Sequence, residues 1–201
     1  VIFDFDGVLI DTILMCYEIH KEFSPDFSYE EYQKLAKGNF LQDYGKIREE
    51  RKYISHSDFH DQYEKKVCDI DIPPVLKEIV EKLSQSYKLS IVSSSLTPVI
   101  EKYLKDKDML KYFDEILGFD FHASKVFKLE KLLKDHKVAP KDTVFITDTL
   151  SDILEANEVG IPAVAISWGL HDRATFAPGH PAAIIDDPKD LIPIIELILS
   201  S

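Results

Sequence analysis

After residue 73 the chain alternates between short apolar runs and segments with helical periodicity, and this alternation limits its fold more than any other feature. Segments of helical period separate apolar runs of strand length at 88–92, 115–118, 143–147, 161–167 and 182–186. Strands that alternate with helices predict a parallel sheet covered by helices on both faces. The apolar run at 1–5 adds a further buried strand at the start of the chain.

The stretch from about residue 12 to 71 has a different character. It is rich in Tyr, Glu, Lys, His and Asp, its apolar residues fall at helical spacing, and Ser28 with Glu31 forms a capping box. Two prolines, Pro73 and Pro74, mark its end. We therefore expect an α/β fold: a doubly wound, Rossmann-like parallel sheet core of residues 1–14 and 74–201. A small all-helical cap of residues 15–73 is inserted after the first strand.

Composition excludes several classes of partner. The net charge of -12 repels nucleic acid phosphates, so no nucleic acid partner is expected. No apolar run approaches the ~18 residues of a membrane helix, and no leader is apparent. Two cysteines, Cys16 and Cys68, without metal-like spacing favour a reducing, cytoplasmic location. We expect a monomer or weak homodimer, with a few native residues before Val1.

Polar residues follow four of the predicted strands. The first strand ends in DFDG (4–7) and the second in SSS (93–95), while Lys125 begins the helix after the third. The fourth ends at Asp148, four residues before Asp152. Ligands of doubly wound sheets bind beyond the carboxyl ends of the strands. These side chains should therefore converge on one crevice.

A cluster of carboxylates needs a cation, and hard oxygen ligands suit Mg²⁺. The cation would also offset repulsion between this acidic protein and a small phosphorylated metabolite. A carboxylate could then attack phosphorus as a nucleophile. Lys125 and the Ser93 hydroxyl would hold the phosphoryl oxygens as charge develops on them.

Four motifs in order resemble those of the haloacid dehalogenase-like (HAD) hydrolase superfamily with a helical cap of the first class. They are VIFDFDGVL (1–9), LSIVS (89–93), Lys125 and VFITDTLSD (144–152). The resemblance covers the whole core. It implies a phosphoric monoester hydrolase with a Rossmann-like core that uses Mg²⁺.

The resemblance also implies a role for each matching residue. Asp4 would be the nucleophile that forms an aspartyl-phosphate, and Asp6 the acid and base. Metal ligands would be Asp4, Asp6 through its backbone carbonyl, and Asp148. Asp152 would support the site from behind or pair with Lys125. Phosphate would be bound by Ser93, the backbone near Ser94, and Lys125.

Asp6 separates branches of the superfamily. Dehalogenases and phosphonate-cleaving members lack an aspartate two residues after the nucleophile, whereas a phosphate ester needs an acid for the departing oxygen. Asp6 therefore favours a phosphatase. The alternatives are a sugar-phosphate phosphomutase similar to β-phosphoglucomutase and a non-enzymatic phospho-acceptor or binding protein.

Two further segments resemble parts of relatives. Lys37-Gly38-Asn39 is similar to a cap loop that reaches the active site, which makes Lys37 a candidate substrate contact. Ser167-Trp168-Gly169 resembles the phosphoglycolate phosphatase-like branch.

Simpler interpretations stay open for several residues. Lys128 could take the place of Lys125, and Ser93 could be a turn serine. Asp148 could cap the helix that follows it, and Asp152 could be a first-turn partner of the helix dipole.

Overall fold

The computed structural model describes residues 1–35 and 56–200. Its centre is a six-stranded parallel sheet in the order β3-β2-β1-β4-β5-β6, which confirms the predicted α/β architecture. The strands are β1 (Ile2–Phe3), β2 (Ser90–Val92), β3 (Glu115–Leu117), β4 (Phe145–Thr147), β5 (Ala163–Ile166) and β6 (Ala183–Ile185).

Strand β1 lies at the middle of the sheet and pairs with strands from both halves of the chain. Ile2 is in register with Ser90 of β2 and with Phe145 of β4. The chain first builds the side of β2 and β3, then returns to build the side of β4 to β6. The boundary between β1 and β4 is therefore the point where the strand order reverses, and a ligand site is expected at its carboxyl edge.

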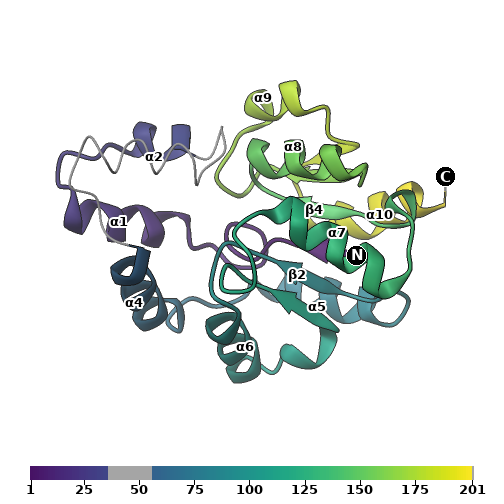
Figure 1. The fold of residues 1–201 in the computed structure, drawn as a ribbon, viewed down its shortest axis with the longest axis horizontal. Helices are drawn as coiled ribbons and strands as arrows, with labels where there is room; N and C mark the ends of the chain where they lie inside the picture. The colour runs from purple at the N-terminus through teal and green to yellow at the C-terminus, as the bar shows by residue number, and fades with distance from the viewer. Residues whose placement is uncertain (36–55, 201) are drawn as a thin grey trace.

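Successive strand residues face opposite sides of the sheet and enter two hydrophobic clusters. Phe3 and Ile146 pack in one cluster, while Ile2 and Phe145 pack in the other. Helices α7 (Lys125–His136) and α8 (Leu150–Val159) cover the second side (Figure 1). The first side is covered by α5 (Pro74–Ser84), α6 (Thr97–Asp106) and α10 (Leu191–Leu199).

Short helical turns complete the connections between these elements. They are α9 (Arg173–Phe176) and the 3₁₀ helices η1 (Leu110–Tyr112), η2 (Pro140–Asp142), η3 (Ala177–Gly179) and η4 (Pro188–Asp190).

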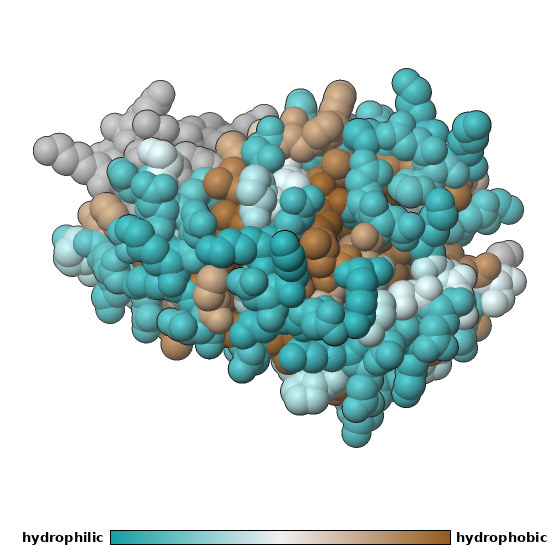
Figure 2. Space-filling model, turned by 90° about the horizontal axis from the view of Figure 1, so that it is seen from below, coloured by the Kyte–Doolittle hydropathy of each residue, from teal (hydrophilic) through white to brown (hydrophobic). Residues whose placement is uncertain are grey.

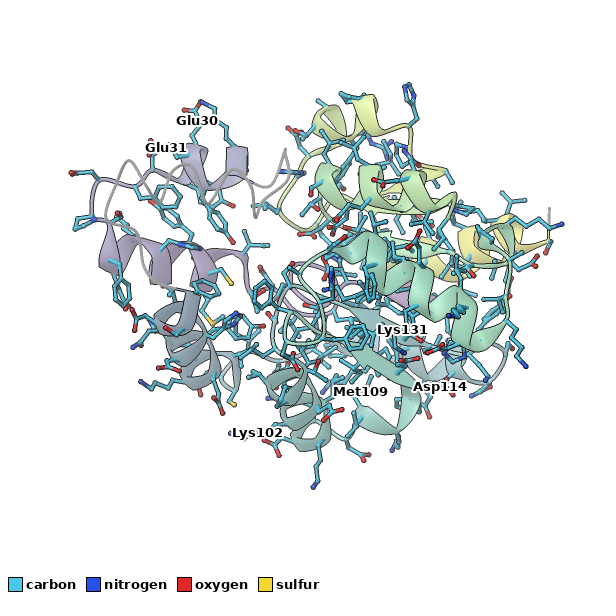
Figure 3. The ribbon with its side chains drawn as sticks, viewed as in Figure 1. Glu30, Glu31, Lys102, Met109, Asp114 and Lys131 are labelled. Atoms are coloured by element: carbon cyan, nitrogen blue, oxygen red, sulfur yellow. The ribbon has the colours of Figure 1, made fainter. Side chains whose placement is uncertain are left out.

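The segment inserted after β1 forms a helical group beside the sheet (Figure 1). Its described helices are α1 (Ile13–Phe23), α2 (Tyr29–Leu35) and α4 (His56–Val67). The predicted capping box begins α2: the Ser28 amide donates to Glu31 Oε2 at 2.9 Å, and the Glu31 amide donates to Ser28 Oγ at 3.2 Å. Glu31 lies beside Glu30 on α2, whereas Asp114 and Lys131 belong to the part of the molecule built around the sheet (Figure 3).

Aromatic rings fill the interior of this insertion. The Tyr17 ring packs against Phe27 and Tyr32, and His20 stacks on Phe59 with ring centroids 4.8 Å apart. Phe27 and Tyr32 belong to the same hydrophobic cluster as Phe3 of the sheet, and Tyr17 and Phe59 pack against it, so the insertion packs on the core. The division into a core of 1–14 and 74–201 and a cap of 15–73 stays a prediction.

The face seen in Figure 2 is mostly hydrophilic, with apolar side chains gathered toward its middle. Within the described ranges, every helix is too short or too polar to cross a bilayer.

Candidate active site

A cavity of about 140 Å³ lies at the carboxyl ends of β1, β2 and β4. Most of its wall comes from the core, and Ile13 of α1 and Tyr32 of α2 also line it. The core residues that line it are Asp4, Asp6, Ser94, Ala123, Lys125, Asp148, Thr149, Ser151, Asp152, Glu155 and Leu170. Most residues predicted from the four motifs therefore meet at one place.

Lys125 joins two carboxylates at the floor of this cavity. Asp4 directly follows β1, and its amide donates to the Ile146 carbonyl at 2.9 Å, which fixes it beside β4. Lys125 Nζ lies 2.7 Å from Asp4 Oδ2 and 2.7 Å from Asp152 Oδ2. All three side chains are buried, so the charges are paired away from water.

The electrostatics of this trio separate the two carboxylates. Burial acts to lower the pKa of Lys125, but the charges of Asp152 and Asp4 outweigh it and raise that pKa, so the amine stays protonated. Burial acts to raise the pKa of Asp152, yet Lys125 and a hydrogen bond from Thr147 hold it below its ordinary value. At Asp4 burial wins over Lys125, and the pKa is well above its ordinary value. Lys125 therefore does not fully offset the cost of burying the ionised Asp4, and a further cation would stabilise this carboxylate.

A further cation would also stabilise the carboxylate of Asp148. It follows β4 and is almost fully buried, and its Oδ2 accepts the Leu170 amide at 2.8 Å. Its Oδ1 is buried and has no hydrogen-bond partner among the residues that the structure describes. Burial raises the pKa of Asp148 to about 7, against the effect of the Leu170 hydrogen bond. A buried carboxylate oxygen without a partner is costly, so a cation is a fitting occupant beside it.

Two glycines allow the backbone to approach Asp148. A Cβ at Gly7, whose φ is +74°, would lie 2.0 Å from Asp148 Oδ2. A Cβ at Gly169 would lie 2.3 Å from Asp148 Cβ. Any larger residue would displace this carboxylate, which explains glycine at both positions.

Asp6 is oriented by three hydroxyl groups. Thr12 Oγ1 and the Tyr63 hydroxyl donate to its Oδ1 at 2.7 and 2.6 Å, and Ser95 Oγ donates to its Oδ2 at 2.7 Å. Sequence reasoning did not find this set. No sequence signal pointed to it, because Tyr63 lies 57 residues from Asp6 and Ser95 lies 89 residues from it.

The serines after β2 differ in position: one lines the cavity, and another is buried beneath it. Ser94 lines the cavity, whereas Ser93 is fully buried and its Oγ accepts the Ser95 amide at 3.0 Å. Lys128, the alternative to Lys125, is buried, and its Nζ donates to the Ser93 carbonyl at 2.6 Å. Lys128 therefore supports the serine loop, while Lys125 lines the cavity.

Other predicted residues are placed as follows. The cap of α8 is Thr149, whose Oγ1 accepts the Asp152 amide at 3.3 Å, so the interpretation of Asp148 as the helix cap is wrong. Trp168 is half-buried, and its indole donates to the Val8 carbonyl at 3.4 Å. Lys37 lies outside the described residues.

The donor set fits Mg²⁺ in a particular way. Within 1–35 and 56–200, no three His, Cys, Asp or Glu side chains are arranged to hold a metal ion by themselves. Mg²⁺ seldom needs such a cage, because it typically takes one or two carboxylates and keeps waters or substrate oxygens. Asp148 and Asp4 would be two such carboxylates. Asp148 has a buried oxygen without a partner among the described residues, and the pKa of Asp4 is raised by burial.

Comparison with known proteins identifies similar sequences over the whole chain. The sequence model described as "Haloacid dehalogenase-like hydrolase" matches residues 1–166. The phosphoglycolate phosphatase of Synechococcus elongatus is 23% identical, over 99% of this chain and 98% of the relative. The pyrophosphatase PpaX of Oceanobacillus iheyensis is 28% identical, over 97% of this chain and 95% of the relative.

Solved structures show the same fold. A haloacid dehalogenase-like hydrolase from Streptococcus pneumoniae superposes with a TM-score of 0.74 at 23% identity, covering 96% of this chain and 95% of that one. CbbY from Rhodobacter sphaeroides, in complex with phosphate, superposes with a TM-score of 0.78 at 17% identity, covering 97% of both chains.

Proposed function

The chain belongs to the haloacid dehalogenase-like hydrolase family, and from this premise we propose that it is a Mg²⁺-dependent phosphatase of small phosphate monoesters that works through an aspartyl-phosphate. The observation that carries the proposal is the convergence of Asp4, Asp6, Lys125 and Asp148 on one cavity. The names of the relatives, phosphoglycolate phosphatase and pyrophosphatase, support phosphate release as the reaction.

Asp4 is the proposed nucleophile. Its Oδ1 accepts the Phe5 amide at 2.7 Å and its Oδ2 accepts Lys125, so the carboxylate is held in one orientation at the cavity floor. A fixed nucleophile does not have to lose rotational freedom during the reaction. Attack by Asp4 on phosphorus would break the bond to the ester oxygen and leave the phosphoryl group on the carboxylate.

Asp6 is the proposed acid and base. It would donate a proton to the departing ester oxygen and then take a proton from the water that hydrolyses the aspartyl-phosphate. Its side chain lines the same cavity as Asp4. Lys125 and the backbone around Ser94 would hold the phosphoryl oxygens.

Mg²⁺, held by Asp4, Asp148 and the Asp6 carbonyl, would neutralise charge on the phosphoryl oxygens when bound. This role answers the electrostatic problem of the cavity. Five of its lining residues are acidic, Asp4, Asp6, Asp148, Asp152 and Glu155, whereas Lys125 is already shared by two carboxylates. A dianionic ester would therefore be repelled without further positive charge.

The remaining expectations belong to the same proposal. Cys16 and Cys68 are both free, which suits a reducing, cytoplasmic location. The substrate would be a small phosphorylated metabolite. The phosphomutase alternative is less favoured because the two relatives above are named for hydrolysis.

Release of inorganic phosphate from 4-nitrophenyl phosphate tests the proposal. Activity should require Mg²⁺ and disappear in EDTA. Asp4→Asn should lower kcat by roughly a thousand-fold or more, because the covalent nucleophile is lost. Asp69→Asn, the same change at an exposed position, is the matched control and should keep full activity. An active Asp4→Asn protein would refute the mechanism.

A further inference from the structure

The hydroxyl groups around Asp6 come from three different parts of the chain. Thr12 precedes α1, and Ser95 follows β2. Tyr63 lies on α4 of the insertion, 57 residues from Asp6 in sequence, and makes the shortest of the three contacts at 2.6 Å. The helical insertion thus contacts the proposed acid/base, Asp6, through the hydroxyl of Tyr63.

Tyr63 is held firmly in place. Its side chain is 1% exposed, and its ring stacks with Phe59 at a centroid distance of 6.1 Å. Helix α4 packs along α1, which starts directly after Thr12. Burial and the nearby charge of Asp6 raise the pKa of the Tyr63 phenol well above its ordinary value. The hydroxyl of Tyr63 is the donor in this contact, and Asp6 Oδ1 is the acceptor.

The acid/base step depends on how Asp6 is oriented. A general acid must lie within hydrogen-bond reach of the departing oxygen, and small displacements of such a group cost rate. Hydrogen bonds from a hydroxyl to a carboxylate are short and directional. Thr12 and Tyr63 both meet Oδ1, so they fix the direction of that oxygen, whereas Ser95 fixes Oδ2.

We propose that Tyr63 is a positioning residue for Asp6, through which the helical insertion sets the orientation of the acid that protonates the leaving group. The proposal rests on the phosphatase function proposed above. Tyr63 does not line the cavity, so its effect reaches the substrate through Asp6.

A pair of substrates that differ in leaving group tests this role. Phenyl phosphate releases a phenolate, whose pKa of about 10 makes protonation valuable. 4-Nitrophenyl phosphate has nearly the same shape and releases a more stable anion that needs little help from an acid. The quantity to measure is kcat/KM, because it reports the steps up to departure of the leaving group.

Tyr63→Phe removes the hydroxyl and keeps the ring. We expect its kcat/KM for phenyl phosphate to fall by about ten-fold or more beyond any fall for 4-nitrophenyl phosphate, since acid catalysis is worth roughly 10²–10⁴-fold. Tyr103→Phe is the matched control: Tyr103 is equally buried, and its hydroxyl donates to the Ile70 carbonyl at 2.8 Å, away from Asp6. The ratio of kcat/KM for the two esters should be the same in Tyr103→Phe as in the wild type.

Each other outcome overturns the proposal. Equal losses on the two substrates, or the same discrimination in Tyr103→Phe, would give Tyr63 no special link to the leaving group. A Tyr63→Phe protein that does not fold would make the hydroxyl a structural requirement. If the wild type releases no phosphate from either ester while Tyr63→Phe is folded, the phosphatase function itself fails, and the role of Tyr63 falls with it.

Discussion

Replacing Asp148 with asparagine should make the metal-free protein more stable while it abolishes activity. The pKa of Asp148 is raised from 3.8 to about 7, mainly by burial. At 1.36 kcal/mol for each pH unit, this difference of about three units corresponds to at most about 4 kcal/mol that the ionised carboxylate costs the fold at pH 8. The asparagine side chain would carry no charge, and its carbonyl oxygen would still accept the Leu170 amide.

The sign of the pH dependence follows from the same difference. Between pH 3.8 and about 7 the native state binds more protons at Asp148 than the unfolded chain does, so wild-type stability falls as pH rises through this window. The advantage of Asp148→Asn should therefore be largest at pH 8 and drop to less than about 2 kcal/mol at pH 5.

Urea unfolding in EDTA at the two pH values measures this difference. Asp152→Asn provides a control with the opposite expected sign. The pKa of Asp152 is lowered because Lys125 outweighs burial, so neutralising it removes a stabilising pair. It should destabilise the protein, whereas Asp148→Asn should stabilise it by at least about 1 kcal/mol at pH 8.

Addition of Mg²⁺ completes the experiment. A ligand that binds the native state stabilises it by mass action, so Mg²⁺ should raise the melting temperature of the wild type and leave that of Asp148→Asn nearly unchanged. The reasoning would be refuted if Asp148→Asn were less stable than the wild type in EDTA at pH 8. It would also fail if the stability difference were the same at pH 5.

Further predictions concern the cavity and the insertion. Gly169→Ala should cost about 1–3 kcal/mol and most of the activity, because its Cβ would overlap Asp148; melting and phosphate release measure both. Lys125→Met should destabilise by about 3 kcal/mol or more, as seen by urea unfolding, since two buried carboxylates lose their cation. Burial lowers the pKa of His20 to about 4, so the unfolded chain binds its proton first as pH falls from 6.5. His20→Phe should remove up to about 3 kcal/mol of this acid sensitivity between pH 7 and 4.5 in the same assay.

Much of the fold was predictable because its signals are local. The alternation of apolar runs with helical segments depends on neighbouring residues, and each predicted strand contains one observed strand. The capping box at Ser28 was predicted for the same reason. Parallel strands place their carboxyl ends at one edge, so the approach of Asp4 to Asp148 also followed from order along the chain.

The supporting contacts were not predictable in this way. The sequence indicated two candidate lysines three positions apart, and both are buried on α7. Which one meets Asp4 and which one meets the Ser93 carbonyl depends on the rotation of that helix against β2 and β4. Helical periodicity indicates only the broad side of the helix that faces the core. Packing against the sheet decides which contacts each side chain on that face makes.

The sequence by itself therefore determined the class of fold, the order of the motifs and the chemical types gathered at the strand ends. Only the tertiary structure decided that Lys125 pairs with two carboxylates and that Tyr63 donates to Asp6. It also decided that one Asp148 oxygen has no hydrogen-bond partner within 1–35 and 56–200. The physical reason is distance along the chain. Periodicity and caps act within a few residues, whereas these contacts join segments whose relative position is fixed only when their apolar faces pack together.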